Sequence, residues 1–193
     1  MLEENFSPEE SLLVIQSMID KTKASVADRS FYFLLWGWLV FIASIGQFVI
    51  KVIFESNWHP IVWSVNIFGF IISIYHGVKE GKKQRVKNYV DDSLHYIWIA
   101  IVIVYILFIV AFARIGWQNC FTFYMMLYGI GSYVTGRLLK FSPLVWGAVA
   151  SWVLSLVSTF TSFDINILLC SAAILVSYII PGYLLRKKYK EQL

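Results

Sequence analysis

The stretch FLLWGWLVFIASIGQFVI, residues 33–50, decides the fold class, because it is apolar, uncharged and about long enough to cross a membrane. A helix needs roughly 20 residues to span about 30 Å of hydrocarbon. An export signal would begin with a short basic region and end in a small-residue cleavage site. Six acidic and three basic residues precede this stretch instead. We therefore expect an uncleaved first membrane helix, with Gln47 as its most polar residue.

The rest of the chain carries more stretches of this kind. Its 193 residues are 59% hydrophobic and 15% charged, whereas soluble domains carry about 25% charged residues. Continuous apolar runs favour helices over the alternating pattern of a membrane barrel. The uncharged runs are 30–50, 56–78, 93–113, 115–136, 141–163 and 165–185. The sequence thus predicts an all-α bundle over 31–185, with transmembrane helices at 31–53, 60–77, 95–113, 117–136, 142–161 and 165–185.

Basic residues fall almost entirely on one side of this predicted six-helix bundle. Of the 16 lysines and arginines, all but Lys51 and Arg114 lie on the side of the two termini. Basic residues in short loops mark the cytoplasmic side of a membrane protein, so we expect both termini in the cytoplasm. Several of these residues abut the spans, so we expect them to contact anionic lipid headgroups rather than nucleic acid. They are Lys82, Lys83, Arg85, Lys87, Arg186, Lys187 and Lys188.

The residues before and after the bundle form separate predicted elements. Within 1–30, the Ser-Pro-Glu-Glu sequence at 7–10 is typical of a capped helix start. Apolar residues then recur at helical spacing, among them Leu12, Ile15 and Ile19. We expect a cytoplasmic amphipathic helix, which either packs on the inner ends of the bundle or binds a protein partner through residues 8–29. Residues 186–193 are expected to form a basic cytoplasmic tail.

Small and weakly polar residues recur at helical spacing along five of the predicted spans. Such stripes let membrane helices approach closely and form hydrogen bonds. The residues expected at these helix-packing seams are Gly37, Ser44, Gly69, Ser73, Gly129, Ser132, Gly147, Ser151 and Ser155. A conducting path or a ligand cavity is the alternative use of the same stripes. The span at 95–113 has no stripe, so we expect it at the lipid-facing periphery or at a contact within a homo-oligomer.

Two amide side chains lie inside the first predicted hairpin. Gln47 and Asn66 are each about six residues from its outer boundary, which places both about 9 Å deep at about 1.5 Å per residue. A lone amide in hydrocarbon is costly, whereas two paired amides satisfy each other. We therefore expect Gln47 and Asn66 to form a structural clasp, with a ligand or ion contact as the alternative.

The sequence shows no pattern typical of catalysis or metal binding. The three histidines lack metal-ligand spacing, and neither HExxH nor a Cys-pair motif is present. Apart from Lys51 at the outer end of the first span, no Asp, Glu, Lys or Arg lies inside a predicted span, which disfavours proton-coupled carriers and voltage sensors. Cys120 and Cys170 are expected as two inert thiols, with a disulfide as the alternative. We expect no enzymatic activity, no metal and no cofactor.

Two segments near the start of the chain carry a resemblance. ESLLVIQSMIDKTK (10–23) followed by FYFLLWGWLVFIASIGQFVI (31–50) resembles a group of uncharacterised small multi-spanning membrane proteins of Bacteroidetes, with looser similarity at PLVWG (143–147). The resemblance implies a bacterial inner-membrane location and no particular activity. Two function classes remain. One is a non-enzymatic sensor, scaffold or accessory protein with a cytoplasmic contact face, and the other is a small passive transporter or channel that uses the polar stripes.

Overall fold

The computed structural model describes residues 30–81 and 89–190, and every regular element among them is a helix. The expected all-α class is therefore confirmed. The first helix covers Ser30–Ile53 and ends in the π-helical segment η1 (Val49–Ile53). The second begins as the 3-10 helix η2 (His59–Ser64) and continues as α2 (Val65–Gly81), and its apolar part is His59–Lys79. The remaining elements are α3 (Tyr89–Ile115), α4 (Cys120–Leu138), α5 (Ser142–Ser158), α6 (Phe163–Ile174), η3 (Leu175–Ile179) and α7 (Ile180–Lys190).

Most helix boundaries lie within one turn of the predicted spans. The exceptions are the end of α2 at Gly81, the start of α3 at Tyr89 and the end of the last helix, which consists of α6, η3 and α7. Because α7 continues to Lys190, residues 186–190 of the predicted tail are helical. Apart from Ser30, the predicted amphipathic helix at 1–30 lies outside the described residues.

Four helices in the described part of the chain are long and apolar enough to cross a membrane. They are Ser30–Ile53, His59–Lys79, Ser93–Ile115 and Phe163–Lys188. α5 is apolar but has only 17 residues. α4 has 19 residues, and the glycines, serine, threonines and tyrosines in CFTFYMMLYGIGSYVTGRL make it less apolar than the other four. The chain is thus a helical protein with four candidate membrane spans.

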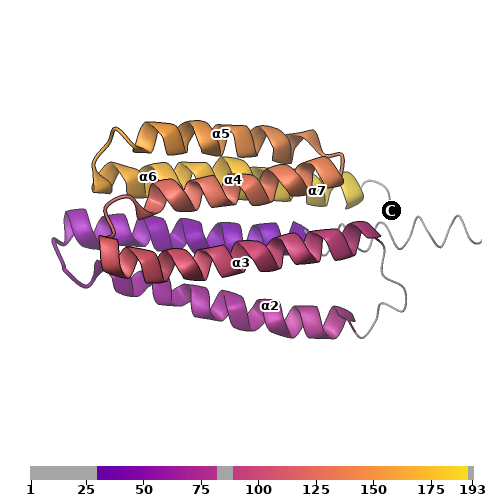
Figure 1. Cartoon of the computed structure of the whole chain (residues 1–193), viewed down its shortest axis with the longest axis horizontal. Coiled ribbons are helices and arrows are strands. Elements are labelled where there is room, and N and C mark those ends of the chain that lie inside the picture. The colour runs from indigo at the N-terminus through magenta and orange to yellow at the C-terminus, as the bar shows by residue number, and fades with distance from the viewer. Residues whose placement is uncertain (1–29, 82–88, 191–193) are drawn as a thin grey trace, which may run out of the picture.

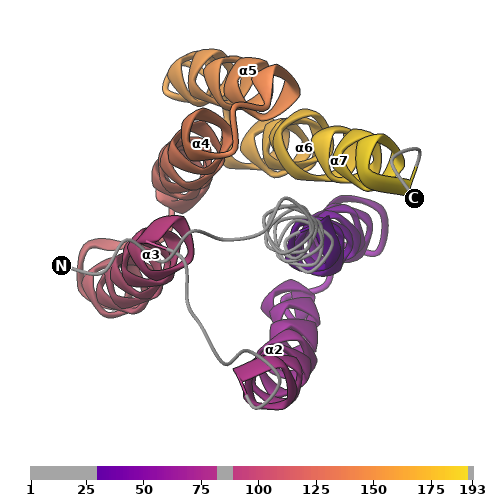
Figure 2. The same ribbon diagram turned by 90° about the vertical axis from the view of Figure 1, so that its right-hand side faces the viewer.

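The helices lie side by side, and their connections alternate between the two ends of the molecule (Figure 1). The end that carries Lys51 and Asp164 is called the ion-pair end here. The opposite end carries the turn between α4 and α5 and the last residues of α7, and is called the basic end. In a view onto the basic end, α4, α5 and α6–α7 form one group, the first helix lies beside α6–α7, and α2 and α3 lie outside (Figure 2).

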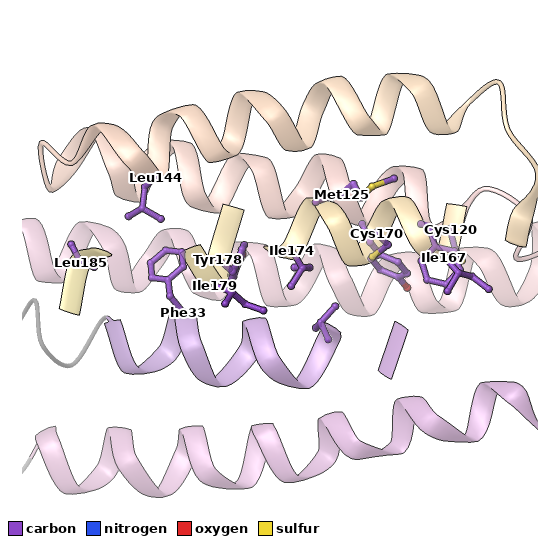
Figure 3. Close-up of a cluster of buried hydrophobic side chains, with 14 of the residues drawn as sticks. Phe33, Cys120, Met125, Leu144, Ile167, Cys170, Ile174, Tyr178, Ile179 and Leu185 are labelled. Carbon is purple, nitrogen blue, oxygen red and sulfur yellow. The ribbon is translucent and has the colours of Figure 1, made fainter. Parts of the chain in front are cut away.

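A continuous apolar core runs along the bundle between these helices. Figure 3 shows it as a row of side chains that extends from Leu185 through Ile174 to Cys120. The most apolar stretch of the last helix is 56% buried, whereas the corresponding stretches of the second helix and α3 are each 11% buried. The last helix is therefore much more buried than α2 and α3, which are peripheral. A peripheral place was expected for α3, the span without a stripe.

α3 packs on this core through one face only. Its buried and half-buried side chains alternate at spacings of four and three residues, which places them in one line along a helix. The line consists of Leu94, Trp98, Ile101, Tyr105, Phe108 and Phe112, and the half-buried Ile97 and Val104 flank it. The other faces of α3 carry exposed isoleucines, leucines and valines, as a surface in contact with lipid does.

The last helix changes its geometry next to a proline. Pro181 has no N–H group, so it cannot donate the usual α-helical hydrogen bond to the carbonyl of Ser177. The π-helical segment η3 (Leu175–Ile179) lies immediately before this position. The hydroxyl of Ser132 on α4 donates to the Ser177 carbonyl at 3.1 Å. A neighbouring helix thus supplies the donor that the proline lacks.

Candidate functional site

Gln47 lies in a buried polar cluster at the ion-pair end. Its side chain is 3% exposed. The indole N–H of Trp63 donates to Gln47 Oε1 at 2.6 Å, and Gln47 Nε2 lies 3.0 Å from His59 Nδ1. Because an indole nitrogen can only donate, the amide oxygen must face Trp63 and the amide nitrogen must face His59. Gln47 Nε2 then donates to His59 Nδ1, which places the proton of a neutral His59 ring on Nε2.

Asn66 does not take part in this cluster. It is buried, and its Oδ1 atom has no hydrogen-bond partner. The seam between the first and second helices pairs Gly46 with Val62, Trp36 with Ser73, and Tyr32 with His76. This register places Asn66 opposite residues 42–43 rather than opposite Gln47. The predicted direct hydrogen bond between Gln47 and Asn66 is therefore wrong.

The physical reason for this error is helix geometry near the turn. The first six residues of the second helix are 3-10 helical, and a 3-10 helix rises about 2.0 Å per residue instead of 1.5 Å. The first helix ends in a π-helical segment, which rises less per residue. Both departures from α-helical geometry place Asn66 further from the hairpin turn than Gln47. In a hairpin of two ideal α-helices, the two residues would lie at the same distance from the turn.

An ion pair lies beside the Gln47 cluster. Lys51 on η1 pairs with Asp164 at the start of α6, and both side chains are partly exposed. Lys51 Nζ also lies 5.2 Å from the centroid of the Phe163 ring, an arrangement that favours a cation. The pair joins the first helix to the last one. The pair was not predicted from the sequence, although Asp164 is the only charged residue between Lys140 and Arg186, and Lys51 is one of only two basic residues on the same side of the predicted bundle.

The serines predicted at seams on α5 donate hydrogen bonds to α4. Ser151 donates to the carbonyl of Met125 and Ser155 to that of Thr122, both at 3.0 Å. One turn further, the hydroxyls of Thr122 and Ser158 lie 2.6 Å apart. These hydroxyl groups are buried and directed across the helix pair. The polar side of α5 is thus occupied by α4.

The other predicted seam residues also lie at helix contacts. Ser44 donates to the Ile167 carbonyl at 2.7 Å, and Ser73 accepts from the indole of Trp36 at 3.2 Å. A Cβ added to any of the four predicted seam glycines would meet a neighbouring helix at overlapping distance. These glycines and their neighbours are Gly37 against Ile179, Gly69 against Leu39, Gly129 against Trp152, and Gly147 against the backbone of Val176 and Ser177.

The remaining predicted residues fall in three places. Lys82, Lys83, Arg85 and Lys87 lie outside the described residues. Arg186, Lys187 and Lys188 are exposed on α7 near the basic end. Cys120 and Cys170 are buried free thiols in the core, without a disulfide between them. Within residues 30–81 and 89–190, no group of histidine, cysteine or acidic side chains could hold a metal ion.

The polar groups of the described bundle thus serve mainly to join helices. Two buried side-chain atoms in the described residues, Asn66 Oδ1 and Thr135 Oγ1, have no hydrogen-bond partner. No family model, no curated protein and no solved structure matches the chain.

Proposed function

We propose that this chain is a non-enzymatic integral membrane protein that crosses the membrane six times and serves as a scaffold, sensor or accessory protein. Four helices are candidate spans by length and composition. α4 and α5, with 19 and 17 residues, lie alongside them (Figure 1). A span requires about 17 to 25 residues, so both are long enough. Their polar hydroxyl groups pair with each other or with backbone carbonyls, which lowers the cost of placing them in lipid.

The distribution of charge supports cytoplasmic termini. Among the described residues, the basic end carries Lys79, Arg137, Lys140, Arg186, Lys187 and Lys188. The ion-pair end carries Lys51, which is paired with Asp164, and Arg114. Basic residues favour the cytoplasmic side. The proposed bacterial inner-membrane location rests on the resemblance of residues 10–50 to multi-spanning proteins of Bacteroidetes.

One observation favours a scaffold over a passive channel. The seam hydroxyls of Ser132, Ser151 and Ser155 are fully buried and donate to backbone carbonyls of a facing helix. A water-filled path along these stripes would require the same hydroxyls to face water. Their direction across the helix contacts therefore supports the packing function of the stripes.

Cysteine accessibility tests this proposal. Cys120 and Cys170 are replaced by alanine, and single cysteines are introduced as Ser132→Cys, Ser151→Cys and Ser155→Cys. A membrane-impermeant thiol reagent should not label these positions, whereas it should label Phe160→Cys, which stands in an exposed turn with 84% exposure. If the seam cysteines were labelled as fast as Phe160→Cys, the scaffold proposal would be wrong and the channel would be the better explanation.

The protein partner is proposed to bind residues 8–29 on the cytoplasmic side. Affinity purification from native membranes in mild detergent should recover a partner with the full chain and lose it when residues 1–29 are deleted. Recovery of the same partner by both forms would place the contact elsewhere on the protein.

A further inference from the structure

The turn between α4 and α5 has a specific backbone structure. The N–H of Phe141 donates to the carbonyl of Gly136 at 2.8 Å, and the N–H of Lys140 donates to that of Arg137 at 3.3 Å. These two hydrogen bonds define a Schellman motif, in which the first residue past the helix cap adopts a left-handed conformation. That residue is Lys140.

A lysine is an unfavourable choice at this backbone position. Lys140 has a φ of +50°, a region in which the Cβ of an L-residue is crowded. Glycine is the usual residue there because it has no Cβ. The turn itself would be more stable with glycine, so the lysine points to a function of its side chain.

A third basic residue reaches this turn from α7. Lys188 Nζ lies 5.5 Å from the centroid of the Phe141 ring. Phe141 belongs to the buried core together with Leu144 and Leu185, which holds the turn and α7 together. Arg137, Lys140 and Lys188 are all exposed, and no ion pair in the described part of the chain involves any of them.

Exposed apolar side chains occur on the same helix ends as these charges. Trp146 on α5 is 72% exposed, and Leu138 and Leu184 are 37% and 44% exposed. Tryptophan favours the boundary between headgroups and hydrocarbon. Positive charge at a helix end next to apolar surface matches a phospholipid, which carries its anionic group above its acyl chains.

We propose that Arg137, Lys140 and Lys188 form a binding site for the headgroup of an anionic phospholipid, with its acyl chains against the exposed apolar side chains nearby. The site rests on the proposed function, because the topology proposed there places the basic end at the cytoplasmic leaflet. A soluble phosphate would gain the charge interactions alone, so a lipid is the better occupant.

Lipid titration of the purified full chain in mild detergent tests this site. Native mass spectrometry measures binding of phosphatidylglycerol, of neutral phosphatidylcholine, and of glycerol 3-phosphate as the soluble headgroup. The wild type should prefer phosphatidylglycerol to both. Lys140→Gly should lower its affinity about fivefold, the effect of one base at a membrane surface. The same variant should melt at an equal or higher temperature in the absence of lipid, because the backbone strain is removed.

Glu55→Gly is the matched control. Glu55 is also left-handed, with a φ of 48°, and lies in the loop at the ion-pair end. The Glu55→Gly variant should lose the same backbone strain as Lys140→Gly and keep the wild-type affinity for phosphatidylglycerol. Unchanged phosphatidylglycerol affinity in Lys140→Gly would overturn the site, as would equal binding of glycerol 3-phosphate or phosphatidylcholine by the wild type. Binding in detergent does not depend on orientation, so an inverted topology with intact binding would overturn the proposed function alone.

Discussion

Gln47 shows how a long apolar helix accommodates a strongly polar side chain. Trp63 donates to its amide oxygen, and its amide nitrogen lies within hydrogen-bond distance of His59. Two partly exposed side chains of the second helix thus satisfy the buried amide of the first helix. One indole and one imidazole near the hairpin turn are enough to provide hydrogen-bond partners for the amide of Gln47.

Removal of Gln47 should therefore affect Trp63 and leave Asn66 unaffected. Gln47→Leu leaves the indole N–H of Trp63 unpaired, so it should lower the free energy of unfolding by about 1–3 kcal/mol. A double-mutant cycle with Trp63→Phe should show a coupling energy of about 0.5 kcal/mol or more. The cycle with Asn66→Leu should be additive. Unfolding in a detergent titration measures the coupling energy in both cycles. Coupling between Gln47 and Asn66, together with no coupling between Gln47 and Trp63, would contradict the observed contacts.

Gly147 permits a close approach between α5 and the last helix. A Cβ at this position would overlap the carbonyl oxygen of Val176 and lie 2.9 Å from the Cα atom of Ser177. Backbone atoms cannot move aside as the end of a flexible side chain can. The position therefore requires glycine for reasons of space.

Gly147→Ala should lower the free energy of unfolding by about 1–3 kcal/mol, the usual cost of overpacking. Gly46→Ala is the control, since its Cβ would lie 3.6 Å from Val62 in ordinary contact. Both changes gain about 0.5–1 kcal/mol of helix propensity, so only the packing differs. Thermal melting in detergent should show a lower midpoint for Gly147→Ala alone. Equal midpoints would show that α5 and the last helix are not packed this closely.

At the scale of the element, the last helix is held in an unusual geometry by its neighbours. η3 precedes Pro181, and the helix carries contacts to the first helix, α4 and α5 over this short segment. π-helical segments are rare and occur where a helix must adjust to its surroundings. Here the adjustment presents the Ser177 carbonyl to the hydroxyl of Ser132.

The contribution of the Ser132 hydroxyl to the free energy of unfolding should depend on Pro181. In the wild type, Ser132→Ala should lower the free energy of unfolding by about 0.6 kcal/mol, and at most about 1–2 kcal/mol. Pro181→Ala restores an N–H that can donate to the Ser177 carbonyl, so Ser132→Ala should cost less in that background. An equal cost of Ser132→Ala in both backgrounds, measured by denaturation in detergent, would show that the two donors do not serve the same carbonyl.

At the scale of the whole molecule, charge positions in the sequence were enough to predict the helices and their order. The gaps between charged residues predicted helix boundaries within about one turn at most ends, because an apolar run ends where a charge must reach water. The partner of Gln47 could not be predicted in this way. It depends on the 3-10 and π-helical geometry at the hairpin turn, which hydropathy does not report.

The ion pair of Lys51 and Asp164 and the approach of Lys188 to the α4–α5 turn were missed for a related reason. Each depends on which helices are neighbours in space, and neighbours were predicted only within the first hairpin. The contact between the first and last helices brings Lys51 to Asp164. The two residues in this contact are 113 positions apart in the chain, so no local sequence pattern indicates that they meet.

The most direct test of the six-span topology is the location of the turn between α4 and α5. If only the four candidate spans cross the membrane, α4 and α5 lie outside the membrane on the side of the ion-pair end, and so does this turn. If all six helices cross, the turn is cytoplasmic. A single Ser142→Cys in a chain without Cys120 and Cys170 reports its side, because Ser142 is exposed at the start of α5. In spheroplasts, an impermeant thiol reagent should label Phe160→Cys and leave Ser142→Cys unlabelled, and in inverted vesicles it should do the reverse. Labelling of both Ser142→Cys and Phe160→Cys in intact spheroplasts would contradict the six-span bundle, because six spans place these two positions on opposite sides of the membrane.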